Sequence, residues 1–209
     1  MILGHEDIQT LDDRYRRTFI NSLAGFRQVV LIGTKSAKGY TNLAIFNSLI
    51  HLGANPAWFG FITRPDSVQR DTLENIIETK EYTFNYVSDE YMKEAHQTSA
   101  RYPQSISEFT AVGLDEEYRL GCSAPFVKQA IVKIAMKFEE RMDIQLNGTS
   151  LIIGSIQKVE LEDRLIGIDG FIALDKEDIL ISCGLDAYFK PKRLDRLTYA
   201  KPDSWPDEI

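Results

Sequence analysis

Apolar residues near the start of the chain recur at every fourth position: Leu11, Tyr15, Phe19 and Leu23. This spacing places them on one face of a helix. Thr10 and Asp13 form a candidate capping pair, and Gly25 is suited to end the helix. The sequence therefore predicts an N-terminal helix with one apolar face.

Beyond this helix, short runs rich in β-branched and aromatic residues predict strands at 29–32, 41–46, 58–62 and 82–87. The first two runs flank a turn at 35–39 and are expected to form a hairpin. Two longer runs, 137–146 and 149–161, meet at Asn147-Gly148, a dipeptide typical of a tight hairpin turn with positive φ angles. Helices are expected at 71–79 and 89–100, whereas 101–121 has no regular pattern.

Many strands with few helices, and no regular alternation of strand and helix, indicate a mainly β fold with helices (α+β) rather than a doubly wound sheet. A closed or nearly closed antiparallel barrel is expected, because closure protects edge strands. No repeat, low-complexity run or linker divides the chain, and 209 residues suffice for one hydrophobic core. We expect residues 1–209 to form a single domain.

The charge and the cysteines exclude several classes of function. A net charge of −7 is unsuited to a nucleic-acid partner, because binding to phosphate backbones needs a concentrated field of Lys and Arg. The first residues lack the features of a signal peptide, and no stretch approaches the roughly 18 apolar residues of a membrane span. We therefore expect a soluble cytoplasmic protein with no membrane contact. Cys122 and Cys183 have no CxxC partner and are expected to be free thiols, with a disulfide between them as the alternative.

Common catalytic and metal-binding motifs are missing from the sequence, which contains no GxGxxG, GxSxG or HExxH. The three histidines, His5, His51 and His96, have neither i,i+4 spacing nor a cluster of cysteines or carboxylates beside them. We expect no metal site, and no side chain stands out as a nucleophile or general base.

The residues that lead into the expected helix at 71–79 include the donors of an anion site. A helix that begins at Asp71-Thr72 presents unpaired backbone N–H groups and the positive end of its dipole. Arg64 and Arg70 add guanidinium donors, and Thr72 and Ser48 add hydroxyls. These donors suit a phosphate monoester. The alternative is that Asp71 only caps the helix and that both arginines are solvated.

The expected strand at 41–46 combines small apolar residues with polar ones. Its Leu-Ala-Ile run at 43–45 would let a flat ring approach the backbone, whereas Thr41, Asn42 and Asn47 would serve the polar edge of the ring. This mixture suits a flavin ring. The alternative is an ordinary polar loop between two strands.

These segments resemble the flavin reductase-like, FMN-binding split-barrel family, which includes flavoredoxin and the small flavin reductases. The family has a TNLAxFxS segment, an NPPxxGF strand, an arginine-proline loop and a [KR]xT step into a helix. This chain reads TNLAIFNS at 41–48, NPAWFGF at 55–61, Arg64-Pro65 and RDT at 70–72, with Ala57 in place of the second proline. Further similar segments are HQTSA at 96–100, APFVK at 124–128 and GLDAY at 184–188.

The resemblance implies a split barrel, noncovalently bound FMN rather than FAD, and a homodimer with the flavin near its interface. It also implies that the phosphate lies with Ser48, Arg64, Arg70 and Thr72, and that the ring lies along 41–47. The candidate cofactor-binding residues are Thr41, Asn42, Leu43, Ala44, Phe46, Asn47, Ser48, Phe61, Arg64, Arg70, Asp71 and Thr72. Because the cofactor carries the hydride chemistry, no catalytic side chain is expected. His96 lies in a shared segment and could reach the flavin or the nicotinamide from a loop; the alternative is a histidine that only packs after a helix.

Three functions are consistent with this resemblance. The first is an NAD(P)H-dependent flavin reductase-like oxidoreductase in which hydride passes through flavin N5. Nicotinamide can stack directly on the flavin in such reductases, so they need no Rossmann motif. The second function is a flavoredoxin-like electron carrier that holds FMN and docks with redox partner proteins. The third is a protein that binds flavin without turnover.

Overall fold

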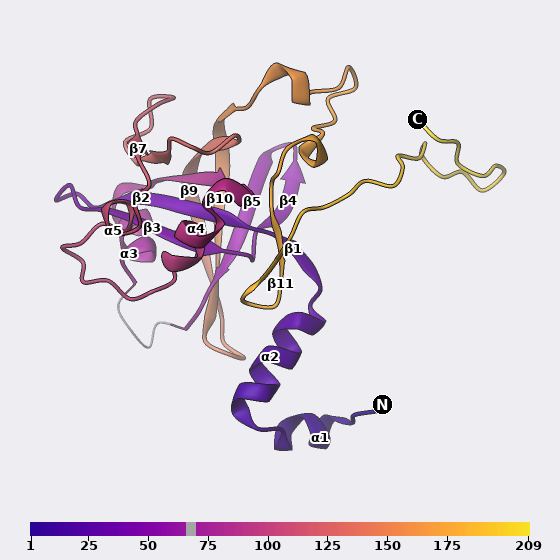
Figure 1. Ribbon diagram of the computed structural model, residues 1–209, viewed down its shortest axis with the longest axis horizontal. Helices are drawn as coiled ribbons and strands as arrows, with labels where there is room; N and C mark the ends of the chain where they lie inside the picture. The colour runs from indigo at the N-terminus through magenta and orange to yellow at the C-terminus, as the bar shows by residue number, and fades with distance from the viewer. Residues whose placement is uncertain (66–69) are drawn as a thin grey trace.

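The computed structural model describes residues 1–65 and 70–209, and its body is an antiparallel sheet (Figure 1). Seven strands form this sheet in the order β3-β2-β6-β9-β10-β5-β4. In chain order they are β2 (Val30–Lys35), β3 (Thr41–Phe46), β4 (Ile50–Ala54), β5 (Ala57–Thr63), β6 (Glu81–Tyr86), β9 (Lys133–Ile144) and β10 (Thr149–Glu160). Every pairing is antiparallel, which confirms the mainly β fold that the sequence predicts.

The path of the chain shows why this sheet must curl. Strands β3 and β4 lie at opposite edges, yet only residues 47–49 join them. In a flat seven-stranded sheet the edges would be about 29 Å apart, whereas the four residue steps between these strands span at most about 14 Å. Within the described strands, the two edges therefore approach each other but do not pair. The sheet is a split barrel.

Two small sheets and the helices lie outside the barrel sheet. Strands β1 (Phe26–Gln28), β11 (Ile181–Cys183) and β12 (Ala187–Phe189) pair in the order β1-β11-β12, and β7 (Glu116–Glu117) pairs with β8 (Phe126–Val127). The α-helices are α1 (His5–Thr10), α2 (Asp13–Leu23), α3 (Asp71–Thr79), α4 (Met92–Gln97) and α5 (Glu108–Val112). Single 3-10 turns are η1 (Asp89–Tyr91), η2 (Asp163–Leu165) and η3 (Leu174–Lys176).

Strand β2 lies between two hydrophobic cores, so it is buried on both faces. Val30 and Ile32 belong to the core inside the barrel, which also holds Phe61. Leu31 lies between them in sequence and belongs to a second core, which holds Phe109 of α5. Alternate residues of a strand point to opposite faces, which explains this division. The second core holds α5 beside β3, where the candidate cofactor-binding segment lies.

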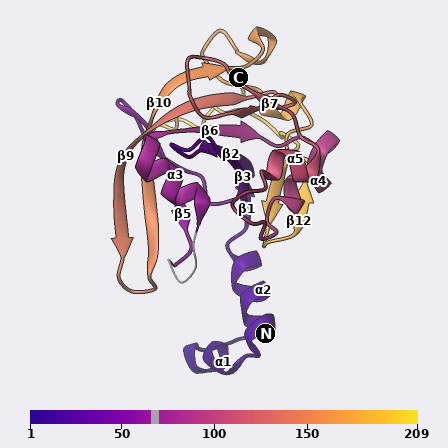
Figure 2. The same cartoon turned by 90° about the vertical axis from the view of Figure 1, so that its left-hand side faces the viewer.

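The N-terminal helix differs from its prediction in two respects. It is split into α1 and α2, and Asp12, rather than Thr10 or Asp13, caps α2 by accepting hydrogen bonds from the backbone N–H groups of Arg14 (3.0 Å) and Tyr15 (3.1 Å). No residue of either helix is buried. Both project away from the barrel (Figures 1 and 2). The apolar face of α2 therefore stays exposed in the single chain.

Other expectations are confirmed with changes in detail. The hairpin at Asn147-Gly148 joins β9 to β10, but Ile144 pairs with Thr149, so residues 145–148 form the loop. Only Gly148 of the dipeptide has a positive φ, at 72°. The expected helix at 89–100 forms η1 and α4 and ends at Gln97. The sequence pattern does not predict β4, which has no buried residue, or α5, which is too short for a helical period to show.

Candidate active site

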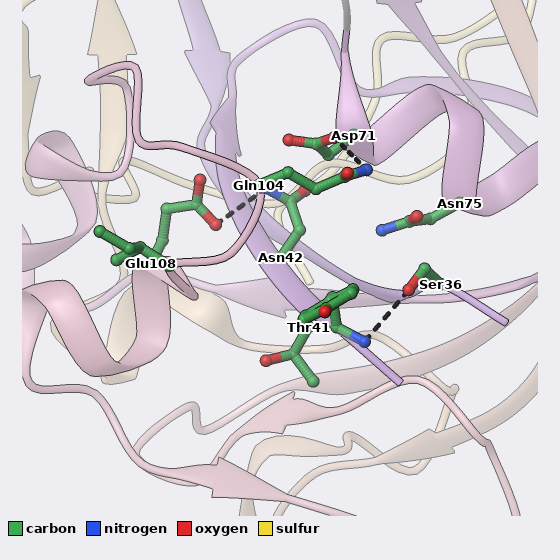
Figure 3. Close-up of a pocket in the computed structure, with 9 residues that line it drawn as sticks. Ser36, Thr41, Asn42, Asp71, Asn75, Gln104 and Glu108 are labelled. Carbon is green, nitrogen blue, oxygen red and sulfur yellow. Dashed lines mark hydrogen bonds between the residues drawn. The ribbon is translucent and has the colours of Figure 1, made fainter. Parts of the chain in front are cut away.

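Most of the candidate cofactor-binding segment lies in β3, and hydrogen bonds hold it to two helices. Figure 3 shows the contact with α5. Asn42 Oδ1 accepts a hydrogen bond from Thr72 Oγ1 of α3 at 2.6 Å. Asn42 Nδ2 donates to Glu108 Oε2 of α5 at 2.8 Å, and the backbone N–H of Leu43 donates to the same oxygen at 2.9 Å. We call these contacts the Asn42 network. They join the predicted ring segment to the helix of the predicted phosphate site.

Glu108 is largely removed from water within the Asn42 network. It is 7% exposed, and burial raises the pKa of its carboxyl, although the hydrogen bonds from Leu43 and Asn42 oppose that rise. A further contact ties α3 to β2, because Asn75 Nδ2 donates to Thr34 Oγ1 at 3.0 Å. A buried polar group that loses its partner is costly, so these contacts fix β3 against its neighbours.

A shallow, open hollow that encloses only about 10 Å³ lies where β3, α3 and α5 meet (Figure 3). It is lined by Ser36, Tyr40, Thr41, Asn42, Asp71, Asn75, Gln104, Ile106 and Glu108. Gln104 Nε2 donates to Asp71 Oδ1 at 2.9 Å, and Thr41 Oγ1 lies 2.7 Å from Ser107 Oγ and 2.5 Å from Glu116 Oε1. Ligand pockets measure about 300 to 1,000 Å³. A cofactor would therefore extend from this hollow over the neighbouring surface.

Glu108 and Gln104 are candidate site residues that the sequence reasoning missed. Both fall in the stretch 101–121, which lacks a periodic pattern. The local signal is Glu108 itself, an acidic residue in the first turn of a helix. Acidic residues favour any helix start. The signal therefore cannot distinguish a buried carboxylate at a site from a solvated one.

Segments that carry the predicted phosphate ligands are connected near the start of α3. Ser48 Oγ donates to the carbonyl of Ile62 at 3.0 Å and accepts its backbone N–H at 3.1 Å, which ties the loop 47–49 to the end of β5. Arg64 follows β5 and is exposed. Arg70 precedes α3, and its Nη2 donates to the carbonyl of Pro65 at 3.5 Å. Residues 66–69 lie outside the described residues.

The start of α3 has a mixed electrostatic character. Arg70 is the N-cap residue, and the first-turn N–H groups form the positive end of the helix dipole. Asp71 and Glu74 in the first turn offset part of that charge. The Thr72 hydroxyl proton is donated to Asn42, so it is not available to a ligand. An anion at this point would depend mainly on arginine side chains and backbone N–H groups.

The predicted ring-binding residues are divided between the core and the surface. Leu43 and Phe61 are 0% exposed, so they lie beneath the site and would not touch a ligand on the surface. Ala44 and Phe46 are partly exposed. Phe46 contacts Phe61 edge-on, with ring centroids 5.0 Å apart. The available apolar surface of this segment is therefore at its C-terminal half.

Segments that resemble the family but are distant in sequence meet in the structure. Asn47 Nδ2 donates to the carbonyl of Gly184 at 2.8 Å and to Ser182 Oγ at 3.1 Å. His96 of α4 is exposed, and its Nδ1 lies 2.7 Å from the hydroxyl of Tyr188 in β12. The two rings are edge-on, with centroids 5.7 Å apart. The structure thus pairs His96 with the segment at 184–188.

Other reactive groups add little to this site. In residues 1–65 and 70–209, no group of three or more His, Cys, Asp or Glu side chains could hold a metal ion. Nor does the same part of the chain contain a helix long and apolar enough to cross a membrane. Cys122 and Cys183 are free and partly buried. Burial raises the pKa of the Cys122 thiol to about 11, which disfavours the reactive thiolate at neutral pH.

Comparison with known proteins identifies the family of this split barrel. Residues 26–168 match the family described as the flavin reductase like domain, and the chain belongs to this family. A solved candidate flavin reductase with a split barrel domain from Shewanella frigidimarina NCIMB 400 is 46% identical; the match covers 96% of this chain and 100% of that chain, with a TM-score of 0.92.

Two more distant solved structures have the same fold. Nitrilotriacetate monooxygenase component B from Bacillus cereus is 18% identical, with a TM-score of 0.82 over 94% of this chain and 98% of that chain. Flavoredoxin of Desulfovibrio vulgaris (Miyazaki F) is 19% identical, with a TM-score of 0.68 over 86% of this chain and 92% of that chain. The split barrel that the sequence predicts is confirmed.

Proposed function

We propose that this protein binds FMN noncovalently, in preference to FAD, and acts as an NAD(P)H-dependent flavin reductase. When bound, FMN would supply the hydride-transfer chemistry between NADH or NADPH and an electron acceptor. The observation that carries the proposal is the hydrogen bond between Asn42 and Thr72, which holds the TNLAIFNS strand to the first turn of α3. Membership of the flavin reductase-like family supports it.

The groups at the start of α3 fit a phosphate. Arg64 and Arg70 would supply the positive charge and the guanidinium donors, and the first-turn N–H groups would add neutral donors. The hydroxyls of Ser48 and Thr72 donate to protein partners. These two residues would therefore shape the site while the arginines and the backbone hold the anion. Asp71 accepts a hydrogen bond from Gln104. Its role toward the phosphate would be limited to its negative charge, which offsets part of the positive charge at the start of α3.

The C-terminal half of β3 fits a flat ring. Strand β3 is at a sheet edge, and the backbone N–H of Leu43 faces outward, where Glu108 binds it. In an antiparallel strand the backbone groups alternate in direction, so those of Ile45 point to the same open side and would serve the polar edge of the ring. Ala44 and Phe46 would provide its apolar contact. Thr41 and Asn42 would position the strand through their protein partners.

The proposal also covers the surroundings of this site. We propose that residues 1–209 act as one domain and assemble as a homodimer with the flavin near the interface. We further propose that the protein works in the cytoplasm without a nucleic-acid partner, a proposal that its net charge of −7 supports.

A flavoredoxin-like electron carrier is the second candidate function. Such a protein would hold FMN in the same place and exchange electrons with redox partner proteins. The fold shared with Desulfovibrio flavoredoxin favours it.

Absorption spectroscopy and rapid kinetics test these candidates in sequence. We expect the purified protein to show flavin absorption and to release FMN, identified by its mass. Anaerobic mixing with NADH or NADPH should then bleach the flavin absorption at a rate typical of enzyme turnover, about 1 to 1,000 per second. Slow bleaching by both nucleotides, with fast reduction by a reduced redox protein, would select the carrier. A protein that neither contains nor takes up FMN would refute both candidates.

A further inference from the structure

Residues 1–25, the N-terminal arm, carry two helices that the barrel does not cover. No residue of α1 or α2 is buried, and the arm projects from β1 (Figures 1 and 2). Tyr15 and Leu23 on the apolar face of α2 are 54% and 70% exposed. Tyr15 stacks on Phe19, with ring centroids 6.2 Å apart. An isolated helix of 11 residues is marginal in water, so α2 needs a surface against which to pack this face.

The arm is anchored to the body at its base. Arg27 Nη2 donates to the carbonyls of Asn21 at 3.3 Å and Gly184 at 3.4 Å. Cys183 Sγ donates to the carbonyl of Ser22 at 3.4 Å. These contacts join the end of α2 to the β11–β12 turn. They hold the arm away from the barrel, so its apolar face is presented outward.

The C-terminal tail, residues 190–209, is a second extended segment that runs from β12 away from the barrel (Figure 1). Its large apolar side chains are also uncovered: Leu194 is 89% exposed, Tyr199 90% and Trp205 94%. The Shewanella structure superposes on 96% of this chain, so most of the arm and tail belong to an architecture that both proteins share.

The accessible surface of the single chain is larger than that of a compact monomer of the same mass. The accessible surface is 12975 Å², whereas a compact monomer of this mass exposes about 9,900 Å². The excess is therefore about 3,100 Å² per chain. Obligate homodimers bury about 2,000 to 5,000 Å² over both subunits together. The excess area is large enough to supply such an interface.

We propose that the N-terminal arm and the C-terminal tail pack on a second copy of this chain, with the apolar face of α2 inside the interface. This inference rests on the proposed function in one respect, namely that the protein is a homodimer. Two chains of net charge −7 repel each other, so the contact must gain its energy from apolar burial. The exposed edge strand β4 and its neighbour β5 offer a receiving surface, where Ile50, Leu52 and Trp58 are 37%, 40% and 40% exposed.

A photo-crosslinker at the apolar face of α2 tests this arrangement in the full-length protein. The variant Phe19→p-benzoylphenylalanine keeps an aromatic group at that position. After illumination we expect a band at twice 23.8 kDa on a denaturing gel, and peptide mapping should join position 19 to the partner chain. The matched control is Arg17→p-benzoylphenylalanine, on the opposite face of α2, which should give little crosslinking. Crosslinks from position 19 that stay within one chain would overturn the proposal.

Charged variants test whether the arm holds the dimer together. Light scattering of the unmodified protein should give twice 23.8 kDa. The double variant Tyr15→Asp/Phe19→Asp should raise the dimer dissociation constant by about a hundredfold or more, because it buries unpaired charges. The control Arg17→Asp should stay within about threefold. Circular dichroism should remain that of the folded barrel, since no residue of α2 is buried in the single chain.

Flavin absorbance of the same samples separates this inference from the proposed function. A dimer that the double variant dissociates, but that contains no FMN, would support the arm contact and contradict the cofactor assignment. A monomer loaded with FMN would overturn the arm contact and leave the cofactor assignment intact. Monomers that sediment with phosphatidylcholine vesicles would also overturn it, because the apolar face would then serve a lipid surface.

Discussion

The Asn42 network and the surface pair of His96 and Tyr188 both contain side-chain hydrogen bonds, but water surrounds them to different degrees. Asn42 and Glu108 are 8% and 7% exposed, whereas His96 lies on the surface. Water can replace a lost partner of an exposed group but not of a buried one. Substitutions in the network should therefore reduce stability and disturb the site together. Substitutions at the surface pair should leave the stability unchanged, so any change in the reaction rate would reflect the chemistry.

The largest effect is expected for Asn42→Ala, which removes the shared partner of Glu108 and Thr72. Both groups would be left buried without a hydrogen bond that they now make. We expect the free energy of unfolding, measured with urea, to fall by about 2 to 4 kcal/mol. The control Asn21→Ala, on the face of α2 opposite Phe19, should stay within about 0.5 kcal/mol. A loss below about 1 kcal/mol for Asn42→Ala would show that water reaches the network.

Arg70 lies at the border between the network and solvent, so Arg70→Ala should separate cofactor binding from stability. We expect FMN affinity to fall by about 1.5 to 3 kcal/mol, the usual contribution of a hydrogen bond to a charged group. Riboflavin lacks the phosphate, so its affinity should hardly change. Titration with both ligands, beside the control Arg17→Ala, measures the difference. Equal losses of affinity for FMN and riboflavin would show that Arg70 does not bind the phosphate.

A smaller effect is expected in the pH dependence of stability. Burial raises the pKa of the Glu108 carboxyl, so the folded protein keeps this proton to a higher pH than the unfolded chain. The resulting stabilisation is fully present below the unfolded pKa of about 4.3. It is lost as the pH rises through the higher folded pKa.

Glu108→Gln tests this contribution, because a neutral amide oxygen can still accept hydrogen bonds from Asn42 and Leu43. Relative to the wild type, the variant should gain stability as the pH rises through that window. Urea unfolding at steps from pH 4 to pH 7 measures the difference. Parallel curves for the two proteins would mean that the Glu108 carboxyl titrates alike in the folded and unfolded states.

The elements that could be predicted from the sequence are those with a local pattern. The β2–β3 hairpin, β5 and β6 follow from β-branched and aromatic runs between turns, and α3 follows from the helical spacing of its apolar residues. A periodic pattern states that a face is apolar but not what covers it. For this reason Tyr15 and Phe19 predict a helix correctly, whereas the exposure of that helix could not be foreseen.

The partners within the candidate site depend on the path of the chain rather than on a local pattern. Glu108 contacts Asn42 across 66 residues, through a stretch that has no periodicity. Burial of Leu43 and Phe61 follows from the second core and the barrel interior, which exist only after the sheet has curled. The motif at 41–48 located the strand. It could not separate residues that face a ligand from those that support them.

The smallest effect is expected at the surface pair, where His96→Ala should leave flavin reduction by NAD(P)H largely unchanged. The rate of hydride transfer between two stacked rings depends mainly on their distance and orientation, which the β3 segment would set. Tyr188→Phe is the matched control, since it removes the 2.7 Å contact with His96 and keeps the ring. Cys122→Ser and Cys183→Ser should change the rate of flavin reduction equally little.

Pre-steady-state reduction, with FMN confirmed bound, measures all four variants. A loss of about a hundredfold or more is the scale of a removed general acid or base. If His96→Ala and Tyr188→Phe both showed this loss of rate with unchanged stability, the pair would be a proton-transfer site. The surface pair would then take part in the chemistry, whereas the buried network would position the strand.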